Sequence, residues 1–439
     1  MNADLRKLYL YHLFNGIAIS VVGNYVFLDK LFLRFDLDMK QLGLIKGIAT
    51  WVPLTVGLLL SPLISRMLAD RQIIGVVYLF RVTVPLLLLW VPSLTRDPRL
   101  LTLANTAILT TTFVFPVIGQ NCMQVIFKEY LPDYQLGKQV GSITILWTLV
   151  ASLAVIPCGW YLDRHSHGSD SEFLRAFLVI CLATTVMQLP ASLLIWRLSP
   201  PRATEASAQT RWIHIFEPFR NGPFRSLLSL LGALGALGAM VDAFINPYLF
   251  SAYNLPTYHV ILIDGGVMLT GIALVPGWGH MTDRFGGKNV LRVGVIGIGI
   301  GLFFLAGHGP VFLSFFALLA WRGVGGIFGF AAGISRQILT IAMSEPNRTN
   351  IYVAAAGFVV GAGYFVGSVL GGNVLDWLAV GMHADLPFEH FRIYFAFCGA
   401  AFLLVGGLVS ALPDSRPQLS PLEMAVAMWR SIRGRAGRA

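Results

Sequence analysis

Long apolar segments separated by short polar ones dominate this chain. Because a helix that crosses a bilayer needs roughly 20 mostly apolar residues, the pattern predicts twelve spanning helices. Their ranges are 8–33, 42–65, 73–93, 100–126, 139–161, 174–197, 226–253, 258–281, 290–306, 312–342, 351–378 and 391–412. The first segment is too long for the apolar region of a signal peptide, so we count it as a helix of the folded protein.

The composition points to the same class of protein. Hydrophobic residues make up 56% of the 439 positions and charged residues only 12%, whereas soluble domains carry about 25% charged residues. These proportions exclude a disordered chain, a fibre, a disulfide scaffold and a water-soluble enzyme. The four cysteines and nine histidines lack metal-ligand spacing, so we expect no metal site and no cofactor. The sequence is that of an all-α integral membrane protein.

The distribution of Lys and Arg predicts the orientation in the membrane. With the N-terminus inside, twenty of these residues fall on the inner side and eight on the outer side. This bias is the positive-inside pattern, which predicts that both termini are cytoplasmic in a multi-pass protein of the inner or plasma membrane. The net charge of +10 therefore reflects basic cytoplasmic loops and not binding of nucleic acid.

Three features recur at nearly the same spacing along the chain. They are the pairs Asp70-Arg71 and Asp283-Arg284, the similar segments 24–32 and 242–250, and the prolines Pro132 and Pro346. Their separations are 213, 218 and 214 residues. The recurrence predicts two pseudo-symmetric six-helix halves, and repeats of this kind place a substrate site near the bilayer midplane between them.

The repeat divides the chain into four units. We expect an N-terminal half at 1–197, a cytoplasmic linker at 198–225, a C-terminal half at 226–412 and a basic cytoplasmic tail at 413–439. Within the tail, Ser420-Pro421 marks the start of a helix and several arginines follow, which predicts a short amphipathic helix on the inner leaflet.

The segment from Gly279 to Lys288 resembles the cytoplasmic signature of the major facilitator superfamily, Gly-x-x-x-Asp-Arg/Lys-x-Gly-basic-basic. Here Gly287 occupies one of the two final basic positions, and the first-half copy is degraded. The resemblance implies a twelve-helix fold in which this loop latches the two halves in the outward-facing state. The implied latch residues are Asp70, Arg71, Gly279, Asp283, Arg284, Gly286 and Lys288.

The chemistry of the expected latch residues suits this function. Gly279 and Gly286 permit a tight turn. Asp283 can face the positive end of a helix, and Arg284 and Lys288 can meet anionic headgroups. A simple positive-inside turn is the alternative interpretation.

Charged residues within spans cost about 2.5 to 3.5 kcal/mol each on insertion scales, so each needs a reason. The resemblance implies that the first, fourth, seventh and tenth helices line the cavity. Asp242 and Arg322 lie roughly 15 Å from the outer ends of their spans, so we expect them to meet. Substrate binding or a conformational change would draw Arg322 away and let Asp242 take up a proton. A purely structural ion pair is the alternative.

Asp29, near the outer end of the first span, is a second candidate for proton coupling. An equal alternative is that it is a solvated charge at the aqueous rim of the span. Lys46 and Asp264 lie at shallow positions, and we expect no role for them. Candidate substrate-binding residues are mostly amides, which suit hydroxyl-rich solutes, together with an arginine that can grip a carboxylate or phosphate. They are Asn24, Gln120, Asn121, Gln124, Asn246, Arg336 and Gln337. Hydrogen bonds between helices are the alternative for each amide.

These features predict a secondary active transporter and not an enzyme, because no paired nucleophile and base and no phosphate-binding loop occur. We expect alternating access, proton-coupled uptake of a sugar-like solute or organic anion, and a monomer, which is usual in the superfamily. An exporter or flippase of amphipathic drugs or lipids is the alternative. The fifth span lacks the Gly-Pro-rich motif of many drug exporters, which disfavours it. A channel would not need two repeated halves.

Overall fold

The computed structural model describes residues 3–22, 24–67, 71–95, 97–130, 136–166, 168–198, 212–307, 315–345, 348–381 and 389–412. Every regular element in these ranges is a helix. The predicted basic tail and residues 199–211 of the predicted linker lie outside the described residues.

The described residues of the first half form eight α-helices and one 3₁₀ helix. They are α1 (Ala3–Val22), α2 (Tyr25–Arg34), α3 (Met39–Met67), α4 (Arg71–Thr83), η1 (Val84–Leu89), α5 (Val91–Leu94), α6 (Pro98–Tyr130), α7 (Leu136–Ser166) and α8 (Asp170–Trp196). Two predicted spans are broken here: α1 and α2 form the first, and α4, η1 and α5 form the third. Pro85 and Pro92 stand at the starts of η1 and α5, where a missing backbone N–H is tolerated.

The second half begins with a short linker segment and repeats the arrangement. Its elements are η4 (Trp212–Phe216), α9 (Glu217–Arg220), α10 (Gly222–Asp242), α11 (Ile245–Ala252), α12 (Thr257–Phe285), α13 (Gly287–Gly307), α14 (Phe315–Ala342), α15 (Thr349–Gly381), α16 (Glu389–Leu408) and η5 (Val409–Ala411). The seventh predicted span is the pair α10 and α11, so it is broken like the first.

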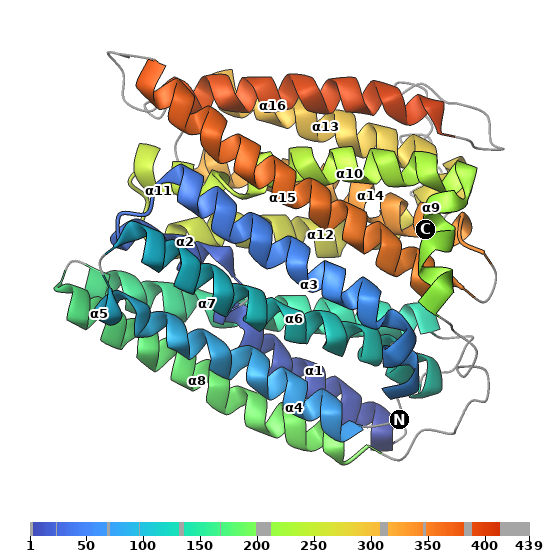
Figure 1. Ribbon diagram of the computed structural model, residues 1–439, viewed down its shortest axis with the longest axis horizontal. Helices are drawn as coiled ribbons and strands as arrows, with labels where there is room; N and C mark the ends of the chain where they lie inside the picture. The colour runs from blue at the N-terminus through green and yellow to red at the C-terminus, as the bar shows by residue number, and fades with distance from the viewer. Residues whose placement is uncertain are drawn as a thin grey trace, which may run out of the picture.

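The helices form one bundle with nearly common direction (Figure 1). Eleven segments in the described part of the chain are long and apolar enough to cross a membrane. The remaining predicted span corresponds to α12, a helix of 29 residues that packs against α7 and α14. We call the end of the bundle where α1 starts and α9 lies the terminal end, and the end with α2, α5 and α11 the distal end.

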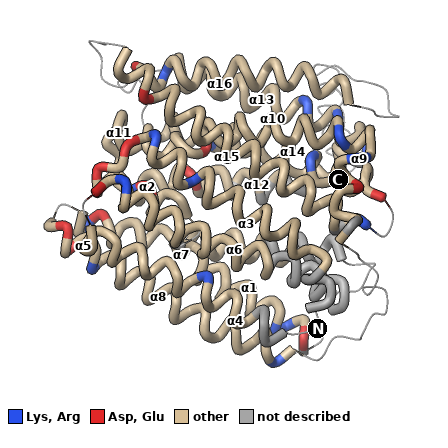
Figure 2. The backbone as a smooth tube through the Cα atoms, viewed as in Figure 1, with Lys and Arg blue, Asp and Glu red and all other residues tan. Residues whose placement is uncertain are grey.

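Charged residues gather at the two ends of the bundle, and only a few lie between them (Figure 2). The broad uncharged band between the ends matches the hydrocarbon layer of a bilayer, where an unpaired charge is costly. The protein is therefore a multi-pass membrane protein, and the few charges inside the band need an explanation.

Each half packs mainly within itself. In the first half α1 packs on α7 and α8, and α3 packs on α6; in the second, α10 packs on α15, and α12 and α13 pack on α14. The halves meet along α3 and α15, along α7 and α12, and where α2 touches α11.

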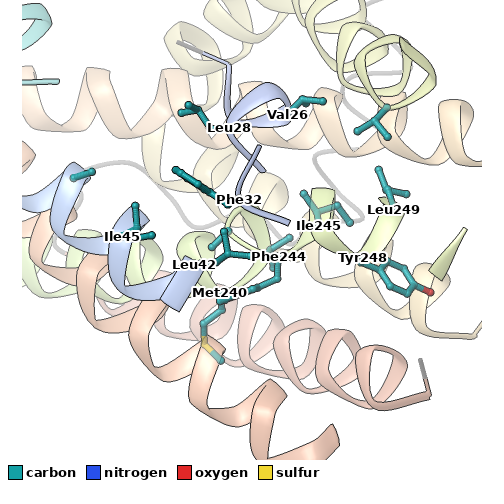
Figure 3. Packing of buried hydrophobic residues seen from close by; sticks show 14 of the residues in the cluster. Val26, Leu28, Phe32, Leu42, Ile45, Met240, Phe244, Ile245, Tyr248 and Leu249 are labelled. Atoms are coloured by element: carbon teal, nitrogen blue, oxygen red, sulfur yellow. The ribbon is translucent and has the colours of Figure 1, made fainter. Parts of the chain in front are cut away.

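An apolar cluster joins the halves near the distal end. Figure 3 shows side chains of α2 and α3, among them Phe32 and Leu42, beside Phe244 and Ile245 from the junction of α10 and α11. All four are buried, with 0–1% of their surface exposed. Close packing of this kind drives helix association in lipid, where apolar burial by itself is no advantage.

Two glycines set the approach of α10 and α15. A Cβ atom at Gly363 would collide with the carbonyl oxygen of Gly232, and one at Gly367 with that of Ala236. Only a residue without a side chain permits this backbone contact.

Substitution Gly367→Leu is therefore expected to separate α10 from α15 and to destabilise the protein by about 1–3 kcal/mol or more, as overpacking does. Thermal unfolding in detergent measures the effect. Gly238→Ala on α10 is the control, because nothing lies within 4 Å of a Cβ there. Equal melting temperatures for Gly367→Leu and wild type would refute the close-packing explanation.

Candidate functional site

The breaks in the first and seventh spans occur at corresponding positions of the repeat. The first break precedes Asn24, which is the N-cap of α2: its Oδ1 accepts a hydrogen bond from the backbone N–H of Val26 at 2.9 Å. The second break is the turn at Ala243 and Phe244 that follows Asp242. Asn24, a candidate substrate ligand, thus uses its carbonyl oxygen to start a helix.

The second break leaves a backbone acceptor free. A helical carbonyl normally accepts from the N–H four residues ahead, and for Ala243 that residue is Pro247, which has no N–H. The side chain of Lys46 on α3 fills the gap, because its Nζ donates to the Ala243 oxygen at 2.6 Å. A cation at the C-terminus of α10 is also favoured by the helix dipole.

Lys46 makes a buried ion pair with Asp29. Its Nζ lies 2.6 Å from Asp29 Oδ1, and both side chains are 0% exposed. Asn246 on α11 donates through Nδ2 to Asp29 Oδ2 at 3.3 Å, and the ring of Tyr25 lies 5.2 Å from the ammonium. Asp29 is therefore not a solvated rim charge, and Lys46, for which no role was expected, is its partner.

A second ion pair joins Arg322 on α14 to Asp264 on α12. Nε and Nη2 of Arg322 each lie 3.1 Å from Asp264 Oδ1. The expected contact between Arg322 and Asp242 does not form. Asp264 and Arg322 each lie seven residues from the distal start of their helices, about 10 Å along the axis, so equal depth brings them together.

Asp242 is the unpaired member of this group. It lies inside the broken seventh span, its side chain is exposed, and it lies within electrostatic range of Arg322, Asp264 and Lys46. We call Asp29, Lys46, Asp242, Asp264 and Arg322 the central charge cluster. Its two cations pair with Asp29 and Asp264, so Asp242 has no ion-pair partner within the cluster.

The remaining candidate ligands lie elsewhere. On α14, Arg336 is half-buried and Gln337 is exposed; Arg336 and Asp242 are also within electrostatic range. The side chains of the three α6 candidates lie outside the described part of the structure. They are Gln120, Asn121 and Gln124. Asn246 lies beside the central charge cluster, because its side chain donates a hydrogen bond to Asp29.

The expected latch loop connects α12 to α13 at the terminal end. Gly286 has φ 86° and ψ 147°, a conformation that is essentially restricted to glycine. Arg284 is exposed, whereas Lys288 is buried and donates to the Leu412 carbonyl at 2.6 Å, so it holds the end of η5 and does not face headgroups. Gly279 lies on α12. Asp70 and the side chains of Arg71 and Asp283 lie outside the described residues.

A family model described as the Major Facilitator Superfamily matches residues 228–437. This match covers the latch loop, the broken seventh span and the Arg322–Asp264 pair, and the whole bundle has the fold of that family's transporters. The second half of the chain thus matches this superfamily. No subfamily is identified, and no curated protein sequence matches the chain.

Solved structures of major facilitator transporters resemble the chain over nearly its full length. The nucleoside transporter NupG has 16% sequence identity and a TM-score of 0.67, with 94% of this chain and 99% of NupG covered. A D-xylose–proton symporter has 16% identity and a TM-score of 0.66, with 94% and 99% covered. The xylose transporter XylE from E. coli, in an inward-open conformation, has 14% identity and a TM-score of 0.66, with 96% and 98% covered. Identities this low establish a shared fold.

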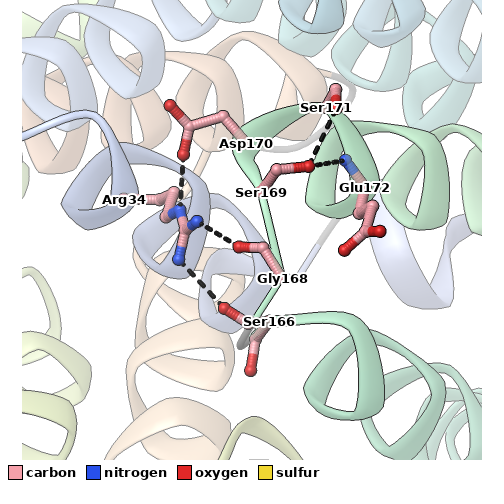
Figure 4. Close-up of polar contacts among 7 residues, drawn as sticks. All are labelled: Arg34, Ser166, Gly168, Ser169, Asp170, Ser171 and Glu172. Carbon is pink, nitrogen blue, oxygen red and sulfur yellow. Dashed lines mark hydrogen bonds and ion pairs between the residues drawn. The ribbon is translucent and has the colours of Figure 1, made fainter.

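Polar contacts join neighbouring elements at the distal end. Figure 4 shows Arg34 of α2 binding the connection between α7 and α8: it donates to Asp170 and to the carbonyl oxygens of Ser166 and Gly168 at 2.8–2.9 Å. Across the two halves, the carboxylate of Asp163 on α7 accepts the first two N–H groups of α12, each at 2.8 Å. These N–H groups lack partners within α12, so one half caps a helix of the other.

At the terminal end, the linker segment η4–α9 docks against both halves. Its buried Ile215 packs with Leu58 of α3 and Ala355 of α15. Glu217 receives a hydrogen bond from His214 at 2.7 Å and an ion pair from Arg348 at 2.5 Å.

Acidification is expected to loosen this linker segment. Partial burial acts to raise the pKa of Glu217, but the hydrogen bonds from His214 and Arg348 outweigh it and hold that pKa below its ordinary value. Docking is then fully stabilised above the ordinary carboxyl pKa and loses this stabilisation as pH falls through the lowered one. Hydrogen exchange at residues 212–220, corrected for intrinsic rates, should rise several-fold in acid. Glu217→Gln should exchange fast at neutral pH already; an unchanged profile in acid contradicts the prediction.

Sequence reasoning missed Lys46 and Asp264 as partners. Pro247 was the available signal for Lys46, since a proline four residues after Ala243 leaves an orphan carbonyl within a span. For Asp264 the signal was its depth, which matches that of Arg322.

Proposed function

We propose that the protein is a proton-coupled secondary transporter that takes up a small polar solute, sugar-like or an organic anion, by alternating access. The moving units would be residues 1–197 and 226–412, connected by the linker 198–225. With the N-terminus in the cytoplasm, as the distribution of Lys and Arg predicts, the distal end faces outward. The Asp163 contacts then support an outward-closed arrangement with Asp242 reached from inside.

The observation that carries the proposal is the unpaired carboxylate of Asp242. It is exposed within a span, while the neighbouring charges Asp29, Lys46, Asp264 and Arg322 are paired. An ionised carboxylate in a membrane interior is costly to enclose. Taking up a proton removes that cost, so occlusion of the site and proton uptake become linked.

Polar groups on α11 and α14, together with the solutes named for proteins of the same fold, support the proposed solute class. Asn246 and Gln337 can both donate and accept hydrogen bonds, and Arg336, which is half-buried on α14, has a guanidinium suited to a carboxylate or phosphate. Nucleosides and xylose, the solutes named for two structural neighbours, are both hydroxyl-rich. These features favour a hydroxylated solute. The solute can also carry an acidic group, because Arg336 could bind it.

A ligand-stabilisation screen in detergent tests the proposal. Its panel comprises sugars, organic anions, phosphorylated metabolites, cationic drugs and lysolipids. A ligand at 100 times its Kd adds about 2.7 kcal/mol to the free energy of unfolding. Stabilisation by sugars or anions, followed by counterflow exchange in liposomes, supports uptake. Arg336→Ala should abolish only the response to anions, with Arg284→Ala as the control; a response to amphiphiles alone would make the protein an exporter or flippase.

A further inference from the structure

Lys46 lies where the two halves meet near the distal end. It belongs to α3 of the first half, yet its Nζ donates to Ala243 at the end of α10 in the second half, at 2.6 Å. Asn246 of α11 reaches back across the same boundary to Asp29 of α2, at 3.3 Å. Two hydrogen bonds in opposite directions thus link α2 and α3 to the broken seventh span.

Both charges at this junction are completely enclosed. The side chains of Lys46 and Asp29 are 0% exposed, and their neighbours in sequence, Leu28 and Ile45, belong to the apolar cluster of Figure 3. A buried ion pair tolerates its loss of hydration only while each charge keeps all its partners. For Lys46 those partners are one carboxylate from its own half and one carbonyl oxygen from the other.

We propose that Lys46 keeps a gate at the distal end closed. Its ammonium binds both Asp29 and the orphan carbonyl of Ala243, and so holds the two halves together there. Opening that end separates α11 from α2 and α3, so the Ala243 oxygen and the Asn246 amide must exchange their bonds for water. Asp29 and Lys46 remain together, because both belong to the first half. The gate therefore opens without separating a charge pair: the two hydrogen bonds at this junction break, together with the two that Asp163 accepts from α12.

Removing either charge destabilises the distal-closed arrangement relative to the distal-open one. In Lys46→Met, the closed arrangement buries an unpaired Asp29 carboxylate and an unpaired Ala243 carbonyl, and both are relieved when water enters the open arrangement. In Asp29→Asn, the closed arrangement buries an ammonium without its carboxylate. Both variants should favour the distal-open arrangement, although the residues lie on different helices.

The inference rests on the proposed function, since a gate has meaning only in a transporter whose halves move. Its test needs neither substrate nor proton gradient. Spin labels at Ser171→Cys on α8 and Gly381→Cys on α15, in a background without the four native cysteines, report the distance between the halves at the distal end. Both positions are exposed, and nothing lies within 4 Å of a Cβ at Gly381.

Pulsed electron paramagnetic resonance on the purified protein should show a longer distance in Lys46→Met and in Asp29→Asn, with the ratio of open to closed molecules raised about tenfold or more. The double variant Lys46→Met/Asp29→Asn contains no buried charge and should lie between the single variants and wild type. Asn246→Ala, which alters no charge and removes one bond between the halves, should shift the ratio in the same direction by a smaller factor.

Arg392→Met/Glu389→Gln is the control, because it removes an ion pair that lies within one half and outside the central charge cluster. Its distance distribution should equal that of wild type. An unchanged distribution in Lys46→Met and Asn246→Ala would overturn the gate, even if both variants melt at lower temperature. An equal shift in the control would overturn it too, because any lost ion pair would then open the molecule. Neither result depends on whether a solute is found.

Discussion

Asp242→Asn is expected to abolish proton-driven accumulation while leaving solute exchange intact. Asparagine imitates the protonated carboxyl group in size and polarity but cannot release a proton. The wild-type protein, if it couples one proton to one solute, can support about a tenfold accumulation for each unit of pH difference. In the variant the accumulation ratio should fall to about one, because an uncoupled carrier only equilibrates its solute.

Proteoliposomes measure both quantities. Uptake is followed with an imposed pH gradient, and counterflow is followed without one. Asp376→Asn is the control, since this exposed carboxylate lies near the distal end of α15 and outside the central charge cluster. Wild-type accumulation by Asp242→Asn would show that another carboxylate couples the proton, and Asp29 and Asp264 would be the next to substitute.

Arg322→Met is expected to cost about 3 kcal/mol of unfolding free energy, the lower end of the range for breaking a buried ion pair. The lower end applies because the Arg322 and Asp264 side chains keep 21% and 26% of their surface exposed. The loss arises from Asp264, which would stay inside the span without a cation. Removing its charge as well, in Arg322→Met/Asp264→Asn, should restore much of the stability.

Thermal or denaturant unfolding of the four proteins forms a double-mutant cycle, which isolates the interaction between the two side chains. Arg392→Met breaks a solvent-facing pair with Glu389 and should change stability by less than about 1 kcal/mol. Additive effects of the two single substitutions would mean that the ion pair contributes nothing to the free energy of unfolding. Arg322 would then stabilise the protein only through contacts with other groups.

The twelve spans could be predicted because hydropathy and length alone decide which segments enter a bilayer. The boundaries shifted by a few residues, and α3 and α15 extend beyond the apolar core at their ends. The latch loop was equally accessible, since the backbone at Gly286 needs a residue without a side chain. Its neighbour Lys288 shows the limit: the motif places the lysine after the turn, but only the fold brings Leu412 to its ammonium.

The pairing of the intramembrane charges needed the tertiary structure. Depth along a helix can be counted from the sequence, but the rotation of the helix about its axis cannot. Asp242 and Arg322 lie at similar depth and were expected to meet, yet Arg322 turns toward α12 and binds Asp264. Lys46 seemed a shallow residue without a role until α10 and α11 brought an unsatisfied carbonyl to its side.

What this sequence determined by itself is therefore the membrane fold: the spans, the repeat of two six-helix halves, and the glycine-dependent turn of the family signature. These follow from local properties, namely apolar length and backbone freedom, which each segment carries independently. Which charge pairs with which, and which carboxylate is left without an ion-pair partner in the central charge cluster, was decided by the packing of helices distant in the sequence. Hydrogen bonds and ion pairs act over a few ångströms, so a small rotation of one helix exchanges one partner for another.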